Sequence, residues 1–312
     1  MATLKEMASK EELFTGGHRA CAGCAFPIAA KLALKAANNP VVVACATGCM
    51  EVATTIYPYT AWKSSFIHSA FENAAATISG VEAAWQALTR KGKLDQKFDL
   101  IAFGGDGGTY DIGFQALSGA MERGHNILYI CYDNGAYMNT GVQRSSATPF
   151  GTHTTTSPAG RVQQGKRQLR KDLTQIIAAH GVPYVAQTTT GHWSDYVKKV
   201  EKALAVDGPA FINVLAPCRL GWGYPPEDTV KIAQEAVQCC FWPAYEVENG
   251  VWRITVKVRE KTPVADWLKK QARFRHLFRP GNEGLLEEIQ AEVDRKWAEL
   301  LKRTEESAEL SA

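Results

Sequence analysis

The sequence of 312 residues has no hydrophobic run near the roughly 20 residues that a membrane-spanning helix needs. Residues 1–13 are mixed and charged, without the apolar core of a signal peptide. The sequence also lacks a large excess of either sign of charge, because 35 Lys and Arg residues against 32 Asp and Glu residues leave a net charge of only +3. Such a balance provides no basic field for a polyanion. We therefore expect a cytoplasmic protein whose partners include neither a membrane nor a nucleic acid.

The sequence has no internal repeat, and its eight cysteines do not suit a disulfide framework in the cytoplasm. Cys45 and Cys131 lie inside apolar, strand-like runs and are typical of inert core thiols. Cys239 and Cys240 are adjacent in a segment that looks helical. The other four each lie in a turn rich in Gly or Pro: Cys21, Cys24, Cys49 and Cys218.

Strand and helix patterns alternate between residues 41 and 218. The predicted strands are 41–45, 64–68, 100–103, 127–132, 183–187 and 210–215. The predicted helices are 27–37, 71–88, 110–123, 168–180 and 193–205. This alternation predicts an α/β fold with one doubly wound, mostly parallel sheet and right-handed crossovers.

The pattern changes after residue 218. A hairpin is predicted at 245–258 around Asn249 and Gly250, followed by an amphipathic helix from residue 284. We therefore expect an α/β domain at 1–218 and a C-terminal helical and hairpin arm at 219–312 that packs on the domain and on partner subunits. The basic and aromatic run at 273–279 is interpreted as a subunit contact.

The stretch 100–141 contains two glycine-rich turns, each at the end of a buried strand. Asp106 lies among Gly104, Gly105, Gly107 and Gly108, and Asn134 follows the next strand 28 positions later (134 − 106). Adjacent parallel strands would bring these oxygen donors together at the sheet edge where α/β proteins bind ligands. Hard oxygen donors beside glycine-rich amides suit Mg²⁺ bound to a diphosphate.

This arrangement resembles the diphosphate motif of thiamin diphosphate enzymes. The resemblance implies that Asp106, Asn134 and the backbone carbonyl of Ala136 hold Mg²⁺. The cofactor-binding residues expected from it are Thr47, Gly48, Gly105, Asp106, Gly107, Gly108, Asn134, Ala136, Asn139 and Thr140.

Cys21 and Cys24 form a C-x₂-C pair, while Cys49 and Cys218 each follow the end of a predicted strand. Four thiolates brought together by the fold are typical of an iron–sulfur cluster. A tetrahedral zinc site is the rival interpretation, and a C-x₂-C pair without any metal is the third.

With these four cysteines and the thiamin diphosphate motif, the sequence resembles the β subunit of the 2-oxoacid:ferredoxin oxidoreductases, in particular the pyruvate synthase group. The motifs that carry the resemblance are GHRACAGC, ACATGCME, PYTAWKSSFIHSAFENAAA, GGDGGTYDIGFQALSGAMERGH, CYDNGAYMNTGVQRSSATPFGTHTTTSP, LAPCRLGW and QARFRHLF. The resemblance implies thiamin diphosphate, Mg²⁺ and one [4Fe–4S] cluster on Cys21, Cys24, Cys49 and Cys218. It also implies a catalytic role for Asn139 at the substrate. Gly135 departs from the pattern, since an acidic residue is common there.

The function that this resemblance implies is oxidative decarboxylation of a small 2-oxoacid, by default pyruvate. Electrons would pass through the cluster to ferredoxin, and coenzyme A would take the acyl group. Thiamin activation also needs a glutamate, and Glu51 and Glu72 are the only acidic residues of this chain in suitable motifs. The resemblance instead implies that the activating glutamate lies on a partner subunit, so that the chain would act only with α and other subunits. A branched-chain 2-oxoacid and oxalate, which would give CO₂ without coenzyme A, are alternative substrates. Two other classes stay open: a non-redox thiamin decarboxylase or synthase with structural zinc, and a nucleotide-binding module.

Overall fold

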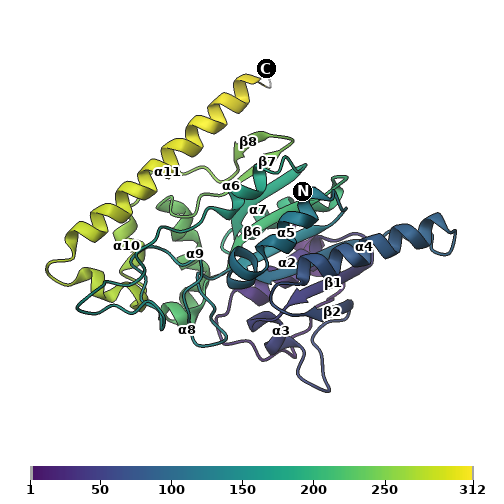
Figure 1. Cartoon of the computed structure of the whole chain (residues 1–312), viewed down its shortest axis with the longest axis horizontal. Helices are drawn as coiled ribbons and strands as arrows, with labels where there is room; N and C mark the ends of the chain where they lie inside the picture. The colour runs from purple at the N-terminus through teal and green to yellow at the C-terminus, as the bar shows by residue number, and fades with distance from the viewer. Residues whose placement is uncertain (1–2, 311–312) are drawn as a thin grey trace.

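The computed structural model describes residues 3–310, which form two layers of helices around one twisted sheet (Figure 1). The strands are β1 Val41–Ala46, β2 Ser65–Ser69, β3 Asp99–Gly105, β4 Leu128–Asp133, β5 Tyr184–Thr189, β6 Ala210–Leu215, β7 Tyr245–Glu248 and β8 Val251–Ile254. Their order in the sheet is β2-β1-β3-β4-β6-β5-β7-β8. The six strands from β1 to β6 pair in parallel, which confirms the predicted fold class.

Helices cover both faces of the sheet because its central strands are apolar on both sides. The helices are α1 Leu4–Ser9, α2 Phe26–Ala36, α3 Cys49–Thr54, α4 Ala74–Arg90, α5 Phe114–Glu122, α6 Leu173–Ala178, α7 Trp193–Ala205, α8 Arg219–Trp222, α9 Thr229–Gln238, α10 Val264–Leu268 and α11 Glu283–Leu310. One core lies between the sheet and the pair α2 and α7, and a second between the sheet and α4, α5 and α6. Strands β4 and β6 are buried at every position, as near-continuous apolar runs of a parallel sheet are.

The chain reverses its direction of winding between β1 and β3. From β1 it crosses to β2 on one side, and it then returns to place β3 and β4 on the other. Open α/β sheets bind ligands in the crevice outside such a switch point. The loops after β1, β3 and β4 therefore meet where a ligand site is expected.

Two predicted helices differ from the structure. The helix predicted at 110–123 begins earlier, with a π-helical turn, η1 Gly107–Ile112, before α5. The helix predicted at 168–180 is reduced to α6, because residues 168–172 are not helical and carry polar contacts to the end of β4 and to η1. Arg170 forms an ion pair with Asp133, and Lys171 donates to the backbone carbonyl of Tyr110.

The C-terminal segment contributes to the main sheet as well as packing on it. The predicted hairpin is present as β7 and β8, and β7 pairs antiparallel with β5. The corners of the hairpin are Asn249 and Gly250, both with positive φ. Helix α11 buries Ile289, Val293 and Leu300 along one stripe. The division at residue 218 stays a prediction.

Between residues 3 and 310, no helix combines the length and the apolar character that crossing a membrane would require.

Candidate active site

A pocket of about 350 Å³ lies at the switch point, where the loops after β1, β3 and β4 meet. All ten residues predicted to bind the cofactor line it: Thr47, Gly48, Gly105, Asp106, Gly107, Gly108, Asn134, Ala136, Asn139 and Thr140. Cys49, Phe71, Tyr132, Tyr137 and Met138 complete the lining. The structure therefore brings the predicted residues of three loops together, although the first and the last are 93 positions apart in sequence (140 − 47).

Three polar groups converge at the predicted magnesium position. One terminal atom of the Asn134 side-chain amide lies 3.0 Å from Asp106 Oδ1 and 2.8 Å from the carbonyl oxygen of Ala136. With its nitrogen in this place, the amide donates two hydrogen bonds. With its oxygen there, three oxygen atoms face one another and need a cation between them. Oxygen ligands of an octahedral Mg²⁺ are about 2.9 Å apart when each lies 2.0–2.1 Å from the ion. Asp106, Asn134 and Ala136 could therefore hold Mg²⁺ after rotation of one amide.

Burial disfavours the ionised form of the Asp106 carboxyl group when no cation is bound. Its pKa is raised to about 8, chiefly by burial and also by the nearby charge of Asp133. Ser145 Oγ donates to Asp106 Oδ2 at 2.5 Å, and the backbone nitrogen of Asn134 donates to Oδ1 at 3.3 Å; both hydrogen bonds oppose this rise. A divalent cation would favour the ionised form far more strongly.

Asp133 is excluded from the magnesium position by Arg170. The guanidinium of Arg170 forms an ion pair with Asp133, and it also donates to Tyr110 Oη at 2.5 Å. Asp133 Oδ1 in turn accepts a hydrogen bond of 3.0 Å from the backbone nitrogen of Gly135. The ion pair and the hydrogen bond to Gly135 together hold the turn after β4 in place.

The glycines after β3 are required by packing. A Cβ atom on Gly107 would overlap the Tyr137 ring, and one on Gly108 would lie 2.8 Å from the backbone carbonyl of Phe71. Tyr137 Oη donates to the Gly107 carbonyl at 2.8 Å and so closes this contact. The π-helical turn that follows Asp106 is a form often found at functional sites.

Asn139 lies at the mouth of the pocket and is exposed. Within the described part of the chain its side chain makes no hydrogen bond, whereas the turn itself is closed by the backbone, from Gly141 N to the Met138 carbonyl at 3.2 Å. Thr140 Oγ1 donates to Gln143 Oε1 at 2.5 Å, and Thr47 Oγ1 lies 2.8 Å from His68 Nε2. Asn139 is thus the pocket side chain most available to a bound molecule.

Cys21, Cys24, Cys49 and Cys218, the four-cysteine group, come together beside this pocket. Burial raises the pKa of Cys24 to about 12, and the charges of the other three cysteines of the group raise it further. Burial likewise raises the pKa of Cys49 to about 12, with contributions from Cys218 and Cys21. All four are free thiols, so metal binding would have to stabilise their thiolate forms.

Local contacts hold the cysteines in this arrangement. The C-x₂-C turn is closed by a hydrogen bond of 3.0 Å from Cys24 N to the Cys21 carbonyl. Thr229 Oγ1 donates to the Gly23 carbonyl at 2.5 Å, which joins this turn to the start of α9. Cys218 caps α8 through a 3.4 Å hydrogen bond from Gly221 N to its Sγ.

The four-cysteine group could bind a metal centre of two kinds. Among residues 3–310, no three His, Cys, Asp or Glu side chains are grouped closely enough to bind one metal ion. Zinc holds four thiolates at about 2.3 Å each, so its ligands crowd around one point. A [4Fe–4S] cluster binds each thiolate at a different iron atom and needs them further apart. The donor set suits both kinds of centre, and iron content distinguishes them.

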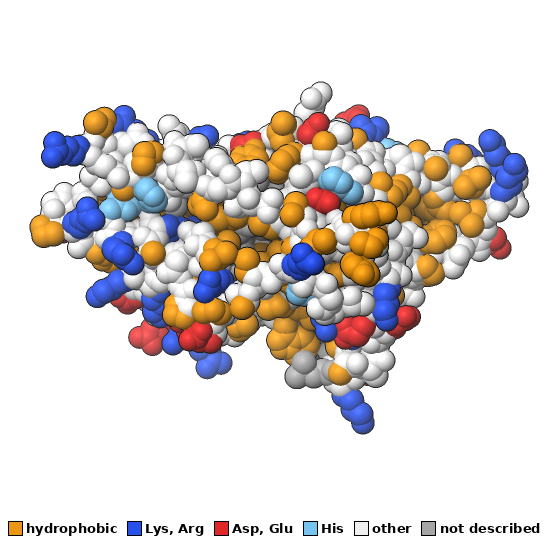
Figure 2. Space-filling view, turned by 90° about the horizontal axis from the view of Figure 1, so that it is seen from below, with side chains coloured by type: hydrophobic (Ala, Val, Ile, Leu, Met, Phe, Trp, Pro, Cys, Tyr) orange, Lys and Arg blue, Asp and Glu red, His pale blue; other side chains and the backbone are white. Residues whose placement is uncertain are grey.

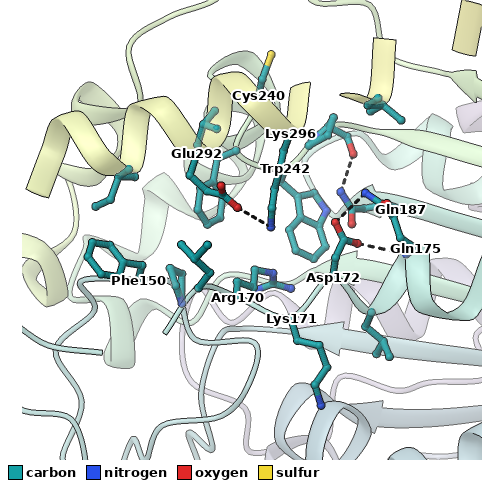
Figure 3. Close-up of a pocket in the computed structure, with 18 of the residues that line it drawn as sticks. Phe150, Arg170, Lys171, Asp172, Gln175, Gln187, Cys240, Trp242, Glu292 and Lys296 are labelled. Atoms are coloured by element: carbon teal, nitrogen blue, oxygen red, sulfur yellow. Dashed lines mark hydrogen bonds and ion pairs between the residues drawn. The ribbon is translucent and has the colours of Figure 1, made fainter. Parts of the chain in front are cut away.

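A second cavity, of about 920 Å³, lies between α11 and the segment 149–173 (Figure 3). Figure 3 shows Glu292 and Lys296 of α11 on one side, Arg170 and Asp172 on the other, and Trp242 between them. The guanidinium carbon of Arg170 lies 4.5 Å from the centre of the Trp242 ring. None of the ten predicted cofactor residues lines this cavity, so the smaller pocket at the switch point is the candidate active site.

Sequence reasoning missed several residues that shape the site. Asp133 and Ser145 lie within a family motif and Arg170 lies outside it, but the sequence assigned no role to any of them, because their partners are set only by the fold. Trp222 Nε1 donates to the Asn134 carbonyl at 2.6 Å from 88 positions away. The run at 273–279, interpreted as a subunit contact, is only partly available for one: Arg275 and Arg279 are exposed, but Arg273 and His276 are buried in the chain.

Comparison with known proteins identifies the family of the chain. Residues 46–214 match the family model described as thiamine pyrophosphate enzyme, C-terminal TPP binding domain. The pyruvate synthase subunit PorB of Methanocaldococcus jannaschii is 56% identical over 289 residues, which are 92% of this chain and 96% of the relative. PorB of Thermotoga maritima is 51% identical over 95% of this chain and 94% of its own length. The ketoisovalerate oxidoreductase subunit VorB of Pyrococcus abyssi is 40% identical over 95% of this chain and 94% of its own length.

A solved structure is similar at the level of the fold. The 2-oxoglutarate:ferredoxin oxidoreductase from Magnetococcus marinus aligns with a TM-score of 0.54 and 22% identity, over 70% of this chain and 69% of that one. The sheet, the pocket at its switch point and these relatives agree: the chain belongs to the thiamin pyrophosphate-binding enzymes, in the family of the pyruvate synthase PorB subunits.

Proposed function

We propose that the chain is the thiamin diphosphate-binding and electron-transferring subunit of a 2-oxoacid:ferredoxin oxidoreductase whose substrate is pyruvate. The observation that carries this proposal is the position of the four-cysteine group beside the pocket, with Cys49 lining it. The reaction converts pyruvate and coenzyme A into an acyl thioester and CO₂, and two electrons leave one at a time to ferredoxin.

The residues of the pocket floor would bind the diphosphate through Mg²⁺. Asp106, Asn134 and the carbonyl of Ala136 would be its protein ligands, which leaves positions for phosphate oxygens, as Mg²⁺ prefers. Thr47, Gly48, Gly105, Gly107, Gly108 and Thr140 would enclose the cofactor. Bound thiamin diphosphate supplies a nucleophilic carbon and an electron sink for decarboxylation.

Asn139 is the proposed substrate-contacting and catalytic residue. Its side chain is exposed at the pocket mouth, and its amide is not engaged by the turn. An amide donor there can bind the substrate carboxylate or the oxygen that becomes negative during addition. Such preorganised donors contribute to catalysis because they cost no reorganisation in the transition state.

The four-cysteine group would bind one [4Fe–4S] cluster. Cys49 belongs both to this group and to the pocket lining, so electrons would leave the cofactor over a short path. A non-redox decarboxylase with structural zinc is the rival proposal, and the iron content of the anaerobically purified complex distinguishes the two.

Partner subunits would complete the site. Asp106 is the only carboxylate among the described residues that line the pocket, and Ser145 and Asn134 hold it at the proposed magnesium position. The lining therefore offers no glutamate to activate thiamin. Strand β2 is an edge strand and is largely exposed, and the side chains of Val52, Tyr57 and Tyr59, which precede it in sequence, are exposed as well. Figure 2 shows apolar side chains gathered in the middle of the face that is turned down in Figure 1. Exposed edges and large apolar patches are typical of subunit contacts.

Pyruvate is the proposed substrate because the PorB relatives are more similar than VorB, at 56% and 51% identity against 40%. A branched-chain 2-oxoacid and oxalate remain as alternatives on the same machinery. With oxalate only CO₂ would form, without coenzyme A. We place the complex in the cytoplasm.

An anaerobic activity screen tests this proposal. The co-purified complex is assayed for ferredoxin reduction with pyruvate, a branched 2-oxoacid, 2-oxoglutarate and oxalate, each with and without coenzyme A. We expect the highest turnover efficiency with pyruvate and dependence on coenzyme A. Decarboxylation without ferredoxin reduction, in a complex whose metal is zinc, would contradict the proposal; a preference for another 2-oxoacid would correct only the substrate.

A further inference from the structure

Arg273 is a buried cation to which the described part of the chain offers no carboxylate partner. It lies in the 3₁₀ helix η3 Ala272–Phe278 and is only 5% exposed. Its Nε donates to Gln271 Oε1 at 2.9 Å, its carbon Cζ lies 3.8 Å from the centre of the Trp222 ring, and its Nη1 has no acceptor within the described residues. Burying such a charge is costly unless an anion compensates it.

The charged and titratable groups around Arg273 identify that anion. Trp222, on whose ring the guanidinium lies, is the last residue of α8, and Cys218 caps the start of this four-residue helix through the hydrogen bond from Gly221 N to its Sγ. Tyr224, Asp133 and Arg170 are the other titratable groups near the guanidinium. Asp133 is already paired with Arg170. Tyr224 is a buried phenol that lies within reach of Cys218 and Cys24. The available negative charge is therefore that of the four-cysteine group in its thiolate form.

From this geometry we infer that Arg273 is the buried counter-cation of the metal centre bound by Cys21, Cys24, Cys49 and Cys218, and that it sets the reduction potential of this centre. The inference rests on the proposed function. Four thiolates and a [4Fe–4S] core carry a net negative charge, which increases by one on reduction. A fixed positive charge stabilises the reduced form more than the oxidised one, so Arg273 raises the potential.

Gly135 keeps the cation unpaired. A Cβ atom at this position would lie 3.1 Å from Arg273 Nη1, so a carboxylate there would meet the guanidinium directly. Gly135 has φ of +76°, which Asn and Asp tolerate better than most residues. An acidic residue at 135 would neutralise Arg273, whereas glycine leaves its charge available to the thiolates.

Four proteins test the inference: wild type, Arg273→Gln, Arg273→Lys and, as a control, Arg275→Gln, which changes an exposed arginine of the same 3₁₀ helix. Each full-length chain is reconstituted anaerobically with iron and sulfide. Iron content is measured first, and the midpoint potential is then determined by redox titration followed by electron paramagnetic resonance.

We expect the equilibrium constant for reduction of the centre to fall at least tenfold in Arg273→Gln. For a one-electron couple this makes the midpoint potential more negative by about 59 mV or more. Arg273→Lys should recover most of this shift, and Arg275→Gln should match wild type. An unchanged potential in an iron-loaded Arg273→Gln chain would overturn the inference alone. A wild-type chain that binds no iron would instead contradict the proposed function.

A second pair of variants applies if Arg273→Gln fails to fold or to bind iron. Gly135→Asp and Gly135→Asn impose the same backbone strain, but only Asp can neutralise Arg273. The inference requires a more negative potential in Gly135→Asp than in Gly135→Asn. Equal potentials in this pair would overturn it.

Discussion

Ser145 donates a hydrogen bond of 2.5 Å to Asp106 Oδ2, from a loop 39 residues further along the chain. The hydroxyl also receives a hydrogen bond of 3.2 Å from the backbone nitrogen of Ala147. Both side chains are buried, Asp106 to 1% exposure and Ser145 completely. This contact orients one carboxylate oxygen away from the magnesium position and leaves the other, Oδ1, facing Asn134.

Replacing this hydroxyl should weaken cofactor binding. Hydrogen bonds to charged groups contribute about 1.5–3 kcal/mol, so Ser145→Ala should bind Mg²⁺ with thiamin diphosphate roughly tenfold or more weakly. Titration calorimetry on the metal-free complex measures this. Ser146→Ala is the matched control, because Ser146 contacts Asp111 only through its backbone nitrogen. Equal affinities in the two variants would remove Ser145 from the site.

The metal-free chain should lose stability as the pH rises. The pKa of Asp106 is about 8 in the folded chain against 3.8 as its ordinary value, so between these limits the folded state binds more protons than the unfolded state. Stability therefore falls with increasing pH in this window, by at most about 1.4 kcal/mol per pH unit. Asp106→Asn cannot ionise and should lack this dependence.

Chemical denaturation of both proteins between pH 5 and pH 8 checks the sign. We expect the difference in free energy of unfolding between Asp106→Asn and wild type to grow with pH. Addition of Mg²⁺ and thiamin diphosphate should reverse the wild-type trend. Parallel pH profiles of the two metal-free proteins would show that Asp106 ionises normally.

The cysteines should separate into two classes. Replacement of Cys21, Cys24, Cys49 or Cys218 by Ser should remove the visible absorbance and most of the iron, because each thiolate binds a different iron atom. Cys239→Ser should keep both, since Cys239 is buried in the apolar core under α9 and α10. Iron loss from Cys239→Ser together with full iron in Cys218→Ser would mean that the ligand set is wrong.

Asn139→Ala should reduce turnover efficiency about a hundredfold or more while thiamin diphosphate and iron stay bound. A purely structural asparagine would behave differently, with loss of cofactor and near-normal activity in the molecules that retain it. Activity per bound thiamin diphosphate separates the two roles. Near-wild-type activity on this scale would exclude Asn139 from catalysis.

Local patterns predicted the sheet and the pocket because both are encoded in short stretches. The strands that precede Asp106 and Asn134 are apolar runs, and their glycine-rich turns mark the sheet edge. The contacts of Ser145, Arg170 and Arg273 could not be predicted in this way. Each joins segments that are far apart in sequence, and neither the strand order nor the depth of burial that pairs them is visible in any local pattern.

The helix predicted at 168–180 was too long for a related reason. The segment has helical composition, but residues 168–172 are not helical where Arg170 reaches the buried carboxylate of Asp133. A tertiary ion pair at a buried aspartate overrides a weak local propensity. Propensity alone therefore misplaced the start of α6.

The most direct test of the account is to add pyruvate and coenzyme A to the anaerobic complex without ferredoxin and to follow its iron–sulfur absorbance. The wild-type complex should bleach, because electrons from the substrate pass from the thiamin site to the cluster. A complex carrying Asp106→Ala should stay folded and keep its iron, but it should lack thiamin diphosphate and remain oxidised. Bleaching in the Asp106→Ala complex, or CO₂ release by the wild type with no change in absorbance, would contradict the account.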